Sequence, residues 1–244
     1  RDITHIKENE EMVVASEKLS VIGQLAAAVA HEIRNPLTSL KGFIQLMQST
    51  KSINDSHLDI MLSEVDRIDL ISGEMLILGK QQEIHFRQEG LDEILRQVLI
   101  LMEAQAHLDN VAITYENLEG KPLCVLGESN QLKQVFINII KNAVESIPAG
   151  RNGRVSITLA PHGTDARVIV KDNGVGMEPE RIEHLGEPFY STKEKGTGLG
   201  LAVCQKIIER HKGHIHFKSE IQKGTAVEIT LPVKGSEITS DFAD

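Results

Sequence analysis

The sequence predicts an α + α/β protein with two domains: an antiparallel helical hairpin that forms a dimeric four-helix bundle, followed by a two-layer α/β sandwich. Residues 6–79 contain a single proline and place their apolar side chains at helical spacing. After Gln81, stretches with a helical period alternate with short stretches typical of strands. The chain has 244 residues, which is enough for two domains, and its aromatic content is only 3%. Its cores must therefore be built from Leu, Ile, Val and Ala.

The first domain is predicted from two apolar stripes that a polar loop separates. The first stripe follows a heptad seam, and Pro36 interrupts it at a position where we expect a kink. Residues 49–56 are polar and rich in turn-forming residues, which predicts the loop. Two helices alone bury only a thin seam, so we expect a second copy of the chain to complete a four-helix bundle. The first stripe comprises Leu19, Ile22, Ala26, Val29, Ile33, Leu40, Phe43 and Met47, and the second comprises Leu58, Met61, Leu62, Val65, Ile68, Ile71, Met75 and Leu78.

The second domain is predicted from helices and strands in a mixed order. The longest predicted helix begins near Ser129, which we expect to be its N-cap. Helices are predicted over 91–108, 129–147 and 202–211, and strands over 112–115, 122–125, 154–159, 166–171, 213–219 and 225–231, the last two as a closing hairpin. Together they predict helices packed on one sheet.

The overall composition argues against two classes of partner. The formal net charge is −9, whereas nucleic-acid binding requires a basic face, so we expect no nucleic-acid partner. No run of about 18 apolar residues is present, so we expect no membrane contact from this part of the protein. Cys124 and Cys204 lie far apart and match no metal-binding spacing. We expect both to be reduced, in a cytoplasmic location.

Polar side chains share one face of the predicted helix 129–147. Asn138, Asn142 and Glu145 follow steps of three and four residues, with Lys141 beside them. Amide and carboxylate oxygens are ligands that Mg²⁺ accepts together with water and phosphate. A solvated helix face is the alternative, although two asparagines inside a helix lower its intrinsic stability.

Two glycine-rich segments follow this helix, with a polar loop between them. Asp172 ends a predicted strand and precedes Gly174 and Gly176, so a carboxylate lies beside backbone that a ligand can approach closely. Such a carboxylate suits the exocyclic amine of adenine, although D-N-G is also a turn signal. Residues 196–201 (GTGLGL) open a predicted helix, where bare N–H groups and the helix N-terminus favour phosphate. The spacing fits neither a dinucleotide-binding G-x-G-x-x-G nor a P-loop, and residues 187–193 are expected to form a mobile lid.

A histidine lies within the motif HEIRNPL of the first predicted helix. If Ala26 and Ile33 occupy a positions, His31 falls at the outward-facing f position of the heptad. A neutral imidazole attacks phosphorus well when a neighbour holds its N–H, and Glu32 could accept that proton. Asn35, one turn further on, could orient a water molecule. The alternative is an ordinary surface histidine on a charged helix.

The order of these segments resembles the N, G1, F, G2 and G3 boxes of the GHKL (Bergerat) ATP-binding fold, shared by histidine kinases, gyrase, Hsp90 and MutL. The motif HEIRNPL resembles the H-box of sensor histidine kinases, and its context is similar to the sporulation-type kinases of spore-forming Bacilli. The resemblance runs from about Leu19 to Pro232. It implies ATP-dependent autophosphorylation of His31 and phosphoryl transfer to an aspartate of a response regulator.

The resemblance also implies roles for individual residues. Its catalytic group would be His31 as the phosphorylated residue, Glu32 as its assistant and Asn35 for a phosphatase activity. Asn142 would bind Mg²⁺, Lys141 would pair with phosphate, and Asp172 would hold adenine. The implied ATP-binding residues are Asn138, Lys141, Asn142, Asp172, Gly174, Gly176, Lys193, Gly196, Thr197, Gly198, Leu199, Gly200, Leu201 and Thr225.

Domains and partners follow from the same resemblance. We expect residues 1–18 to be a signalling helix from an upstream sensor, 19–80 the dimerisation and phosphotransfer hairpin, 81–89 a linker, 90–234 the ATP-binding domain and 235–244 a disordered tail. The chain starts at Arg1 without methionine, so we expect an upstream sensor region that could anchor the whole protein to the cell membrane. Expected partners are a second copy of the chain, a response regulator receiver domain and a small inhibitory protein on the bundle.

The motifs argue against two other functions. A gyrase-, MutL- or Hsp90-like ATPase needs a transducer domain that brings a lysine to the γ-phosphate, and no residues remain to build one. A dimeric interaction module with a vestigial pocket predicts degraded boxes, whereas Asn142, Asp172 and both glycine motifs are intact. Whether one chain phosphorylates itself or its partner depends on the handedness of the 49–56 loop, which the sequence pattern leaves open.

Overall fold

The computed structural model describes residues 29–79, 86–120, 122–191 and 197–233 of the chain. They fall into two compact units: a helical unit, Arg1–Gln81 with Ser191–Leu199, and an α/β unit, Gln82–Tyr190 with Gly200–Asp244. Several predictions lie outside the described residues, namely those for 1–18, 235–244, Leu19, Ile22, Ala26, Lys193 and Gly196. Within the described residues, no helix is both long and apolar enough to cross a bilayer.

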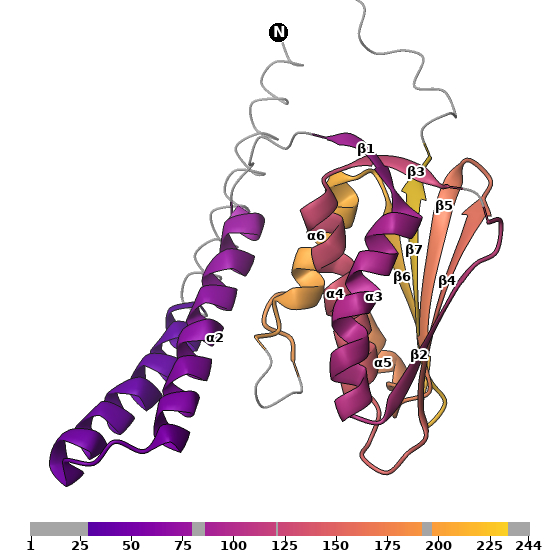
Figure 1. Ribbon diagram of the computed structural model, residues 1–244. Coiled ribbons are helices and arrows are strands. Elements are labelled where there is room, and N and C mark those ends of the chain that lie inside the picture. Colours follow the sequence, from indigo (N-terminus) through magenta and orange to yellow (C-terminus); the bar gives the residue numbers. More distant parts are fainter. Residues whose placement is uncertain (1–28, 80–85, 121, 192–196, 234–244) are drawn as a thin grey trace, which may run out of the picture. The chain divides into compact units, whose positions relative to one another are not determined.

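The helical unit is a hairpin of two helices (Figure 1). The described part of α1 covers residues 29–50 and continues through Pro36, and α2 covers Asp55–Gly79. Lys51 ends α1 with a φ of 50°, and the side chain of Asn54 accepts the backbone N–H of Ser56 at 3.0 Å, as an N-cap does. Both helices therefore extend into the predicted loop 49–56 and leave only residues 51–54 outside them.

The hairpin has one apolar side that is covered and another that is open. Along the covered side of α2, Ile71 is fully buried, and Met61, Ile68 and Met75 are half-buried at a spacing of seven residues. An outer apolar face remains exposed, and it comprises Leu37 and Ile44 on α1 with Leu58, Leu62, Val65, Leu70 and Leu76 on α2. Leu58, Leu62 and Val65 were predicted in the same apolar stripe as Met61 and Ile68, but they are exposed in the described hairpin.

The α/β unit is built on a mixed five-stranded sheet. Its strands lie in the order β2-β4-β5-β7-β6, and only β2 and β4 run parallel. The strands are β2 (Val111–Asn117), β4 (Gly153–His162), β5 (Asp165–Asp172), β6 (His214–Glu220) and β7 (Gly224–Pro232). A separate two-stranded sheet pairs β1 (Arg87–Gly90) with β3 (Cys124–Gly127). The predicted closing hairpin is confirmed, because β6 and β7 pair antiparallel.

Three helices form the second layer on one face of this sheet (Figure 1). They are α3 (Leu91–Leu108), α4 (Ser129–Glu145) and α6 (Gly200–Arg210), and a short α5 (Pro179–Glu183) follows the end of β5. The core lies between the layers, where Phe136 and Ile140 of α4 are fully buried together with Val168 of β5. The predicted two-layer architecture is therefore present in this unit.

The N-cap predicted for α4 is wrong by one residue. Glu128 is the N-cap, because its carboxylate accepts the backbone N–H groups of Asn130 at 3.1 Å and Gln131 at 2.8 Å. Ser129 is the first helical residue. A carboxylate at this position satisfies two N–H groups that would otherwise lack partners, and it also suits the positive end of the helix.

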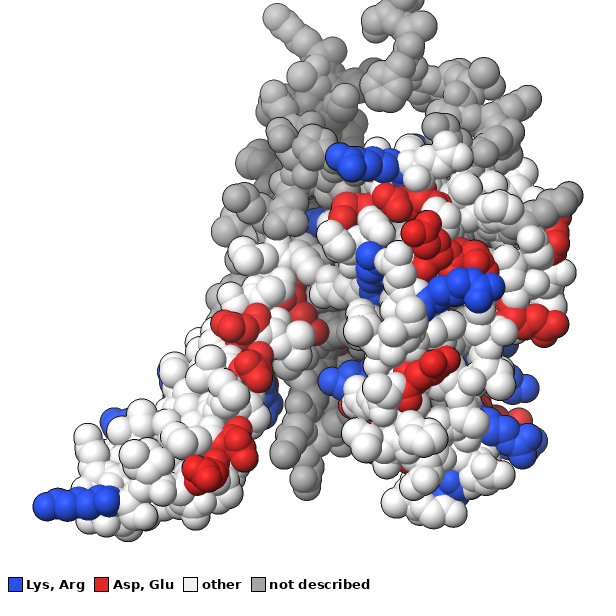
Figure 2. All heavy atoms as spheres, viewed as in Figure 1, with Lys and Arg blue, Asp and Glu red and all other residues white. Residues whose placement is uncertain are grey.

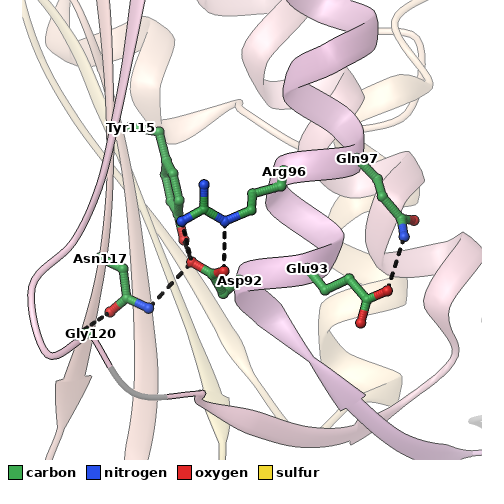
Figure 3. A network of polar contacts seen from close by, with 7 residues as sticks. All are labelled: Asp92, Glu93, Arg96, Gln97, Tyr115, Asn117 and Gly120. Atoms are coloured by element: carbon green, nitrogen blue, oxygen red, sulfur yellow. Dashed lines mark hydrogen bonds and ion pairs between the residues drawn. The ribbon is translucent and has the colours of Figure 1, made fainter.

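Asp92 fastens the start of α3 to the edge strand β2 (Figure 3). Its carboxylate accepts hydrogen bonds from Arg96 Nε at 2.7 Å, Tyr115 Oη at 2.6 Å and Asn117 Nδ2 at 3.3 Å. The hydrogen bond from Arg96 holds the pKa of Asp92 below its usual value. Burial raises the pKa of the Tyr115 phenol, so this hydroxyl stays a donor.

Charged residues of both signs are distributed over the described surface. Figure 2 shows Lys and Arg interspersed with Asp and Glu on the visible face of the α/β unit. Several of them form surface pairs, such as Lys206 with Glu209 and Lys223 with Glu220. Such exposed pairs contribute little stability individually.

Candidate functional site

The motif histidine of the helical unit is exposed on α1. His31 has an exposed side chain, as its predicted heptad position requires, and Asn35 is exposed one turn further along the helix. An imidazole in this place is open to a reactant that approaches from solvent. The described part of the chain thus presents the His31 imidazole on a helix, where it is accessible and chemically able to act as a nucleophile.

Glu32, the neighbour of His31, is held by a residue of the other helix. Arg67 Nη2 of α2 lies 3.2 Å from Glu32 Oε2, and both side chains are about one-quarter exposed. Among the described residues, the Glu32 carboxylate is therefore paired with Arg67 rather than with the imidazole of His31. Sequence reasoning missed Arg67, because 35 residues separate the partners and no local motif links them.

The polar face of α4 presents two amides side by side. Asn142 Nδ2 donates a hydrogen bond to Asn138 Oδ1 at 3.1 Å, so the two side chains hold each other in place one turn apart. Lys141 is about half exposed, and its Nζ lies 3.9 Å from the Glu145 carboxylate. Amide oxygens on one helix face are suitable, together with phosphate oxygens, for Mg²⁺.

Asp172 at the end of β5 is buried, with an exposed fraction of 5%. Its Oδ1 accepts the backbone N–H of Gly174 at 2.8 Å and that of Thr225 at 3.1 Å. Burial raises the pKa of Asp172, and these two N–H groups oppose the rise because they stabilise the carboxylate. A carboxylate has about four acceptor positions, and Oδ1 uses two here, so Asp172 keeps capacity to accept from a ligand.

Two glycines, Gly176 and Gly200, allow neighbouring segments around Asp172 and α4 to approach each other closely. Gly176 has a φ of 68°, and a Cβ there would collide with the backbone oxygen of Glu220. A Cβ on Gly200 would collide with the amide of Asn138, so the N-terminus of α6 lies directly against the polar face of α4. Because a helix N-terminus favours anions, this contact places an element that is suited to phosphate beside the two amides.

The structure brings together most of the predicted nucleotide-site residues of the α/β unit. Val175 N donates to Ser146 O at 3.1 Å, which places the loop after Asp172 at the end of α4. Thr225 contributes its backbone N–H to Asp172, and its hydroxyl lies 2.8 Å from Ser219 Oγ. Leu201 is half-buried in the first turn of α6.

Residues 197–199 group with the helical unit instead. Thr197 Oγ1 donates to Glu74 Oε2 of α2 at 3.0 Å and accepts from Leu199 N at 3.3 Å. Gly198 has a φ of 69°, and Leu199 is fully buried. Thr197, Gly198 and Leu199, which were predicted to bind phosphate, therefore belong to the helical unit, whereas Asp172 belongs to the α/β unit.

The oxygen-bearing side chains of the α/β unit suit a metal ion that is held mainly by water and by the phosphates of a bound nucleotide. Within the described residues, no group of three or more His, Cys, Asp or Glu side chains could hold a metal ion. The paired amides of α4 offer neutral oxygens instead, which suits Mg²⁺ held largely by water and phosphate.

Two family models match the chain. Residues 21–84 match the His Kinase A (phospho-acceptor) domain, and residues 127–235 match the histidine kinase-, DNA gyrase B- and HSP90-like ATPase. The first match contains His31, and the second contains both the polar face of α4 and Asp172.

Several proteins resemble most of this chain. It is 45% identical over 241 residues to sporulation kinase C and 48% identical over 235 residues to sporulation kinase A, both of Bacillus subtilis (strain 168). Each match covers 96% of this chain but only 56% and 38% of the respective relative. The chain thus spans about half the length, or less, of these curated relatives.

Solved structures resemble both parts of the chain. The nucleotide-free catalytic domain of histidine kinase ThkA is 34% identical, with a TM-score of 0.55, and the match covers 61% of this chain and 95% of that one. The structure of ThkA in complex with the response regulator protein TrrA is 32% identical, with a TM-score of 0.75, and the match covers 89% of this chain and 64% of that one.

Proposed function

Because this chain belongs to the histidine kinases and carries a phospho-acceptor domain followed by an ATP-binding domain, we propose that it transfers the γ-phosphoryl group of ATP to His31. The observation that carries the proposal is the exposed His31 on α1, in the same chain as a buried Asp172 that two backbone N–H groups orient. One residue supplies the nucleophile and the other the recognition of the donor.

The phosphoryl step forms one bond and breaks another. A neutral imidazole nitrogen of His31 attacks the γ-phosphorus, the bond from that phosphorus to the bridging oxygen breaks, and ADP leaves. Glu32 accepts the proton from the other ring nitrogen through its Oε1, while Arg67 holds its Oε2. Because phosphoryl transfer depends mainly on positioning and charge neutralisation, a pre-oriented pair of this kind is suited to the step.

We assign nucleotide binding to the α/β unit. Asp172 accepts the exocyclic amine of adenine, while Asn138, Asn142 and the N-terminus of α6 lie at the triphosphate. Lys141 pairs with phosphate, and we also assign phosphate contacts to Lys193 and to residues 196–201, as their motif implies. Mg²⁺, bound by Asn142 together with phosphate oxygens, would neutralise charge on the transferred group.

We further propose that the chain acts as a homodimer and passes its phosphoryl group to an aspartate of a response regulator. The outer apolar face of the hairpin (Leu37, Ile44, Leu58, Leu62, Val65, Leu70 and Leu76) supports the dimer, because it leaves large side chains in solvent. The similarity to ThkA, which has been solved with a response regulator, supports the partner. The names of the relatives support a role for the whole protein in sporulation signalling.

Two finer activities extend this proposal. Asn35 is exposed one turn from His31, which suits a residue that orients water for removal of phosphate from the response regulator. A small inhibitory protein on the bundle would have to cover the same helices as the response regulator, and competition between the two proteins would reveal it.

The test compares His31→Gln with a matched control, His107→Gln. His107 is exposed on α3, outside the phospho-acceptor domain. With ATP labelled at the γ-phosphate and Mg²⁺, we expect the wild type and His107→Gln to acquire label that acid releases and base does not, as a phosphorus–nitrogen bond predicts. We expect His31→Gln to acquire none and to bind ADP like the wild type. Full labelling of His31→Gln would overturn the proposal.

A further inference from the structure

Arg151 connects three segments at the edge of the candidate adenine site. It lies in the loop between α4 and β4 and is half-buried. Its Nη1 donates to the backbone oxygens of Asn173 at 2.9 Å and Gly174 at 2.7 Å. Its Nη2 donates to Gln222 Oε1 at 3.1 Å, in the turn between β6 and β7. A guanidinium group is suited to such a site, because its planar fork presents several donors in fixed directions.

The segment that Arg151 grips is also held from the other side. The Asn173 side chain accepts the backbone N–H of Arg154 at 2.8 Å and donates to the backbone oxygen of Asn152 at 2.9 Å. Gln222 N donates to Val175 O at 2.7 Å. The backbone of residues 173–175 therefore has little freedom to rotate while these contacts persist.

One of these contacts acts directly on Asp172. The carbonyl of Asn173 and the N–H of Gly174 belong to the same peptide group, which is planar. When Arg151 fixes that carbonyl, it also fixes the direction of the Gly174 N–H, which donates to Asp172 Oδ1 at 2.8 Å. The guanidinium thus orients, through one rigid peptide, one of the groups that hold the Asp172 carboxylate, together with the N–H of Thr225 and the side chain of Ser146.

We propose that Arg151 is a positioning residue for base recognition: by orienting the Asn173–Gly174 peptide it holds the Asp172 carboxylate in the direction that selects a purine with a 6-amino group. This inference rests on the proposed binding of adenine by Asp172. In this proposal Arg151 acts on the base through Asp172, so its loss weakens binding of adenine nucleotides and leaves binding of nucleotides without the amine nearly unchanged.

The experiment measures dissociation constants of ADP and of inosine diphosphate, which carries an oxygen in place of the 6-amino group. The whole chain is used, and binding is followed by calorimetry. We expect Arg151→Met to weaken ADP binding about ten-fold, in line with the loss of hydrogen bonds to a charged donor, while inosine diphosphate changes less than about two-fold. The preference for ADP therefore falls about ten-fold.

Two variants serve as controls for the positive charge and for the geometry. Arg154→Met removes an equal charge from a neighbouring exposed side chain, whose residue enters the network through its backbone alone, and we expect no change in preference. Arg151→Lys keeps the charge but has no fork that reaches two carbonyls and Gln222 together, so we expect a fall of about three-fold.

Asp172→Asn separates this inference from the proposal on which it rests. Two backbone N–H groups face Oδ1, so the new amide turns its oxygen to them and its NH₂ toward the amine of the base. We therefore expect Asp172→Asn to abolish the preference for ADP. If it keeps the preference, the proposed adenine recognition is wrong and the role of Arg151 falls with it.

Suppose that Asp172→Asn loses the preference for ADP but that Arg151→Met weakens the binding of ADP and of inosine diphosphate by the same factor. Arg151 then only stabilises the fold, and the inference alone is overturned. If Arg151→Met does not fold, Arg151→Lys decides in its place. A wild-type preference in Arg151→Lys would then contradict the inference.

Discussion

The α/β unit buries the apolar sides of α4 and α6 against its own sheet, whereas the hairpin leaves the outer apolar face of α1 and α2 in solvent. Phe136 of α4 has no exposed surface, while Leu62 of α2 is 62% exposed. The polar groups differ in the same way: Asp172 is buried and held by backbone, and His31 is exposed. The comparison indicates that the described α/β unit buries its core within one chain, whereas the described hairpin leaves apolar side chains that a partner would cover.

The largest expected effect tests whether the α/β unit supports itself. Phe136→Ala removes a fully buried ring, and we expect the free energy of unfolding to fall by about 3–5 kcal/mol. Tyr115 and Tyr190, the two tyrosines of the chain, both belong to this unit, so tyrosine fluorescence in denaturant follows it selectively. The midpoint should not depend on protein concentration. Ile100→Ala, at a 71% exposed position of α3, should cost less than about 0.5 kcal/mol.

If the unfolding midpoint followed by tyrosine fluorescence changed with protein concentration, the α/β unit would also depend on a second copy, and the two units would not differ in this respect. A loss below 1 kcal/mol for Phe136→Ala would contradict the burial of this ring in the core of the α/β unit.

The second prediction concerns the hairpin, whose outer face we expect to close a dimer. Burying a leucine stabilises an interface by about 1.5–3 kcal/mol, so Leu62→Asp should weaken the dimer by at least ten-fold. Light scattering over a dilution series measures the effect. Leu101→Asp is a matched control, because Leu101 is 64% exposed but lies on α3. Equal weakening by both variants would show that the dimer does not form through the hairpin.

The third prediction separates the chemistry of the two units. Arg67→Met frees the Glu32 carboxylate, and we expect the rate constant for phosphorylation of His31 at saturating ATP to fall roughly ten-fold while KM for ATP stays constant. Arg67→Lys should restore most of the rate, and Lys41→Met on α1 should leave it unchanged. A rise in KM for ATP would instead indicate that Arg67 contributes to nucleotide binding, and the chemical step would then not be confined to the helical unit.

The smallest expected effect is a pH dependence confined to the α/β unit. His211 is buried, its Nδ1 lies 2.7 Å from Ile207 O, and its Nε2 accepts the backbone N–H of Glu128 at 3.1 Å. Burial lowers the pKa of His211 below its ordinary value of 6.5, although Ile207 O and the nearby Glu128 oppose the shift. Below pH 6.5 the unfolded chain therefore binds a proton that the folded unit does not, so stability is full above that pH and declines as the pH falls through it.

Thermal unfolding of the α/β unit between pH 7.5 and 5.5, followed by tyrosine fluorescence, measures this decline. His211→Gln should be less stable at pH 7.5 but should show a smaller change with pH. The same pH slope in the variant and the wild type would assign the effect to other groups.

The sequence predicted the elements with long periodic patterns well, and it missed those that depend on short or distant contacts. Helix α3 has the bounds that the period indicated, because seven buried side chains define its inner face. Strand β1 and helix α5 have four and five residues, which is too short for a period to be recognised. The N-cap of α4 was placed one residue late, since Glu128 and Ser129 are both polar and only the backbone conformation distinguishes them.

In the candidate site, too, residues that belong to a local motif were predicted, and residues that act through distant contacts were missed. Asp172 and Thr225 were predicted from motifs, and the structure joins them by one hydrogen bond. Arg67 and Arg151 belong to no motif, because their partners lie 35 and at least 22 residues away. A contact of this kind can be found only after the chain has brought the segments together.

If His31 receives the phosphoryl group, as we propose, the modified residue can be located on the chain itself. The wild-type chain is incubated with ATP and Mg²⁺, digested at alkaline pH and analysed by mass spectrometry under conditions that preserve phosphorus–nitrogen bonds. We predict one phosphorylated peptide, with the added mass assigned by fragmentation to His31 and absent after brief acid treatment. Phosphate on any other residue, with His31 unmodified, would contradict the account.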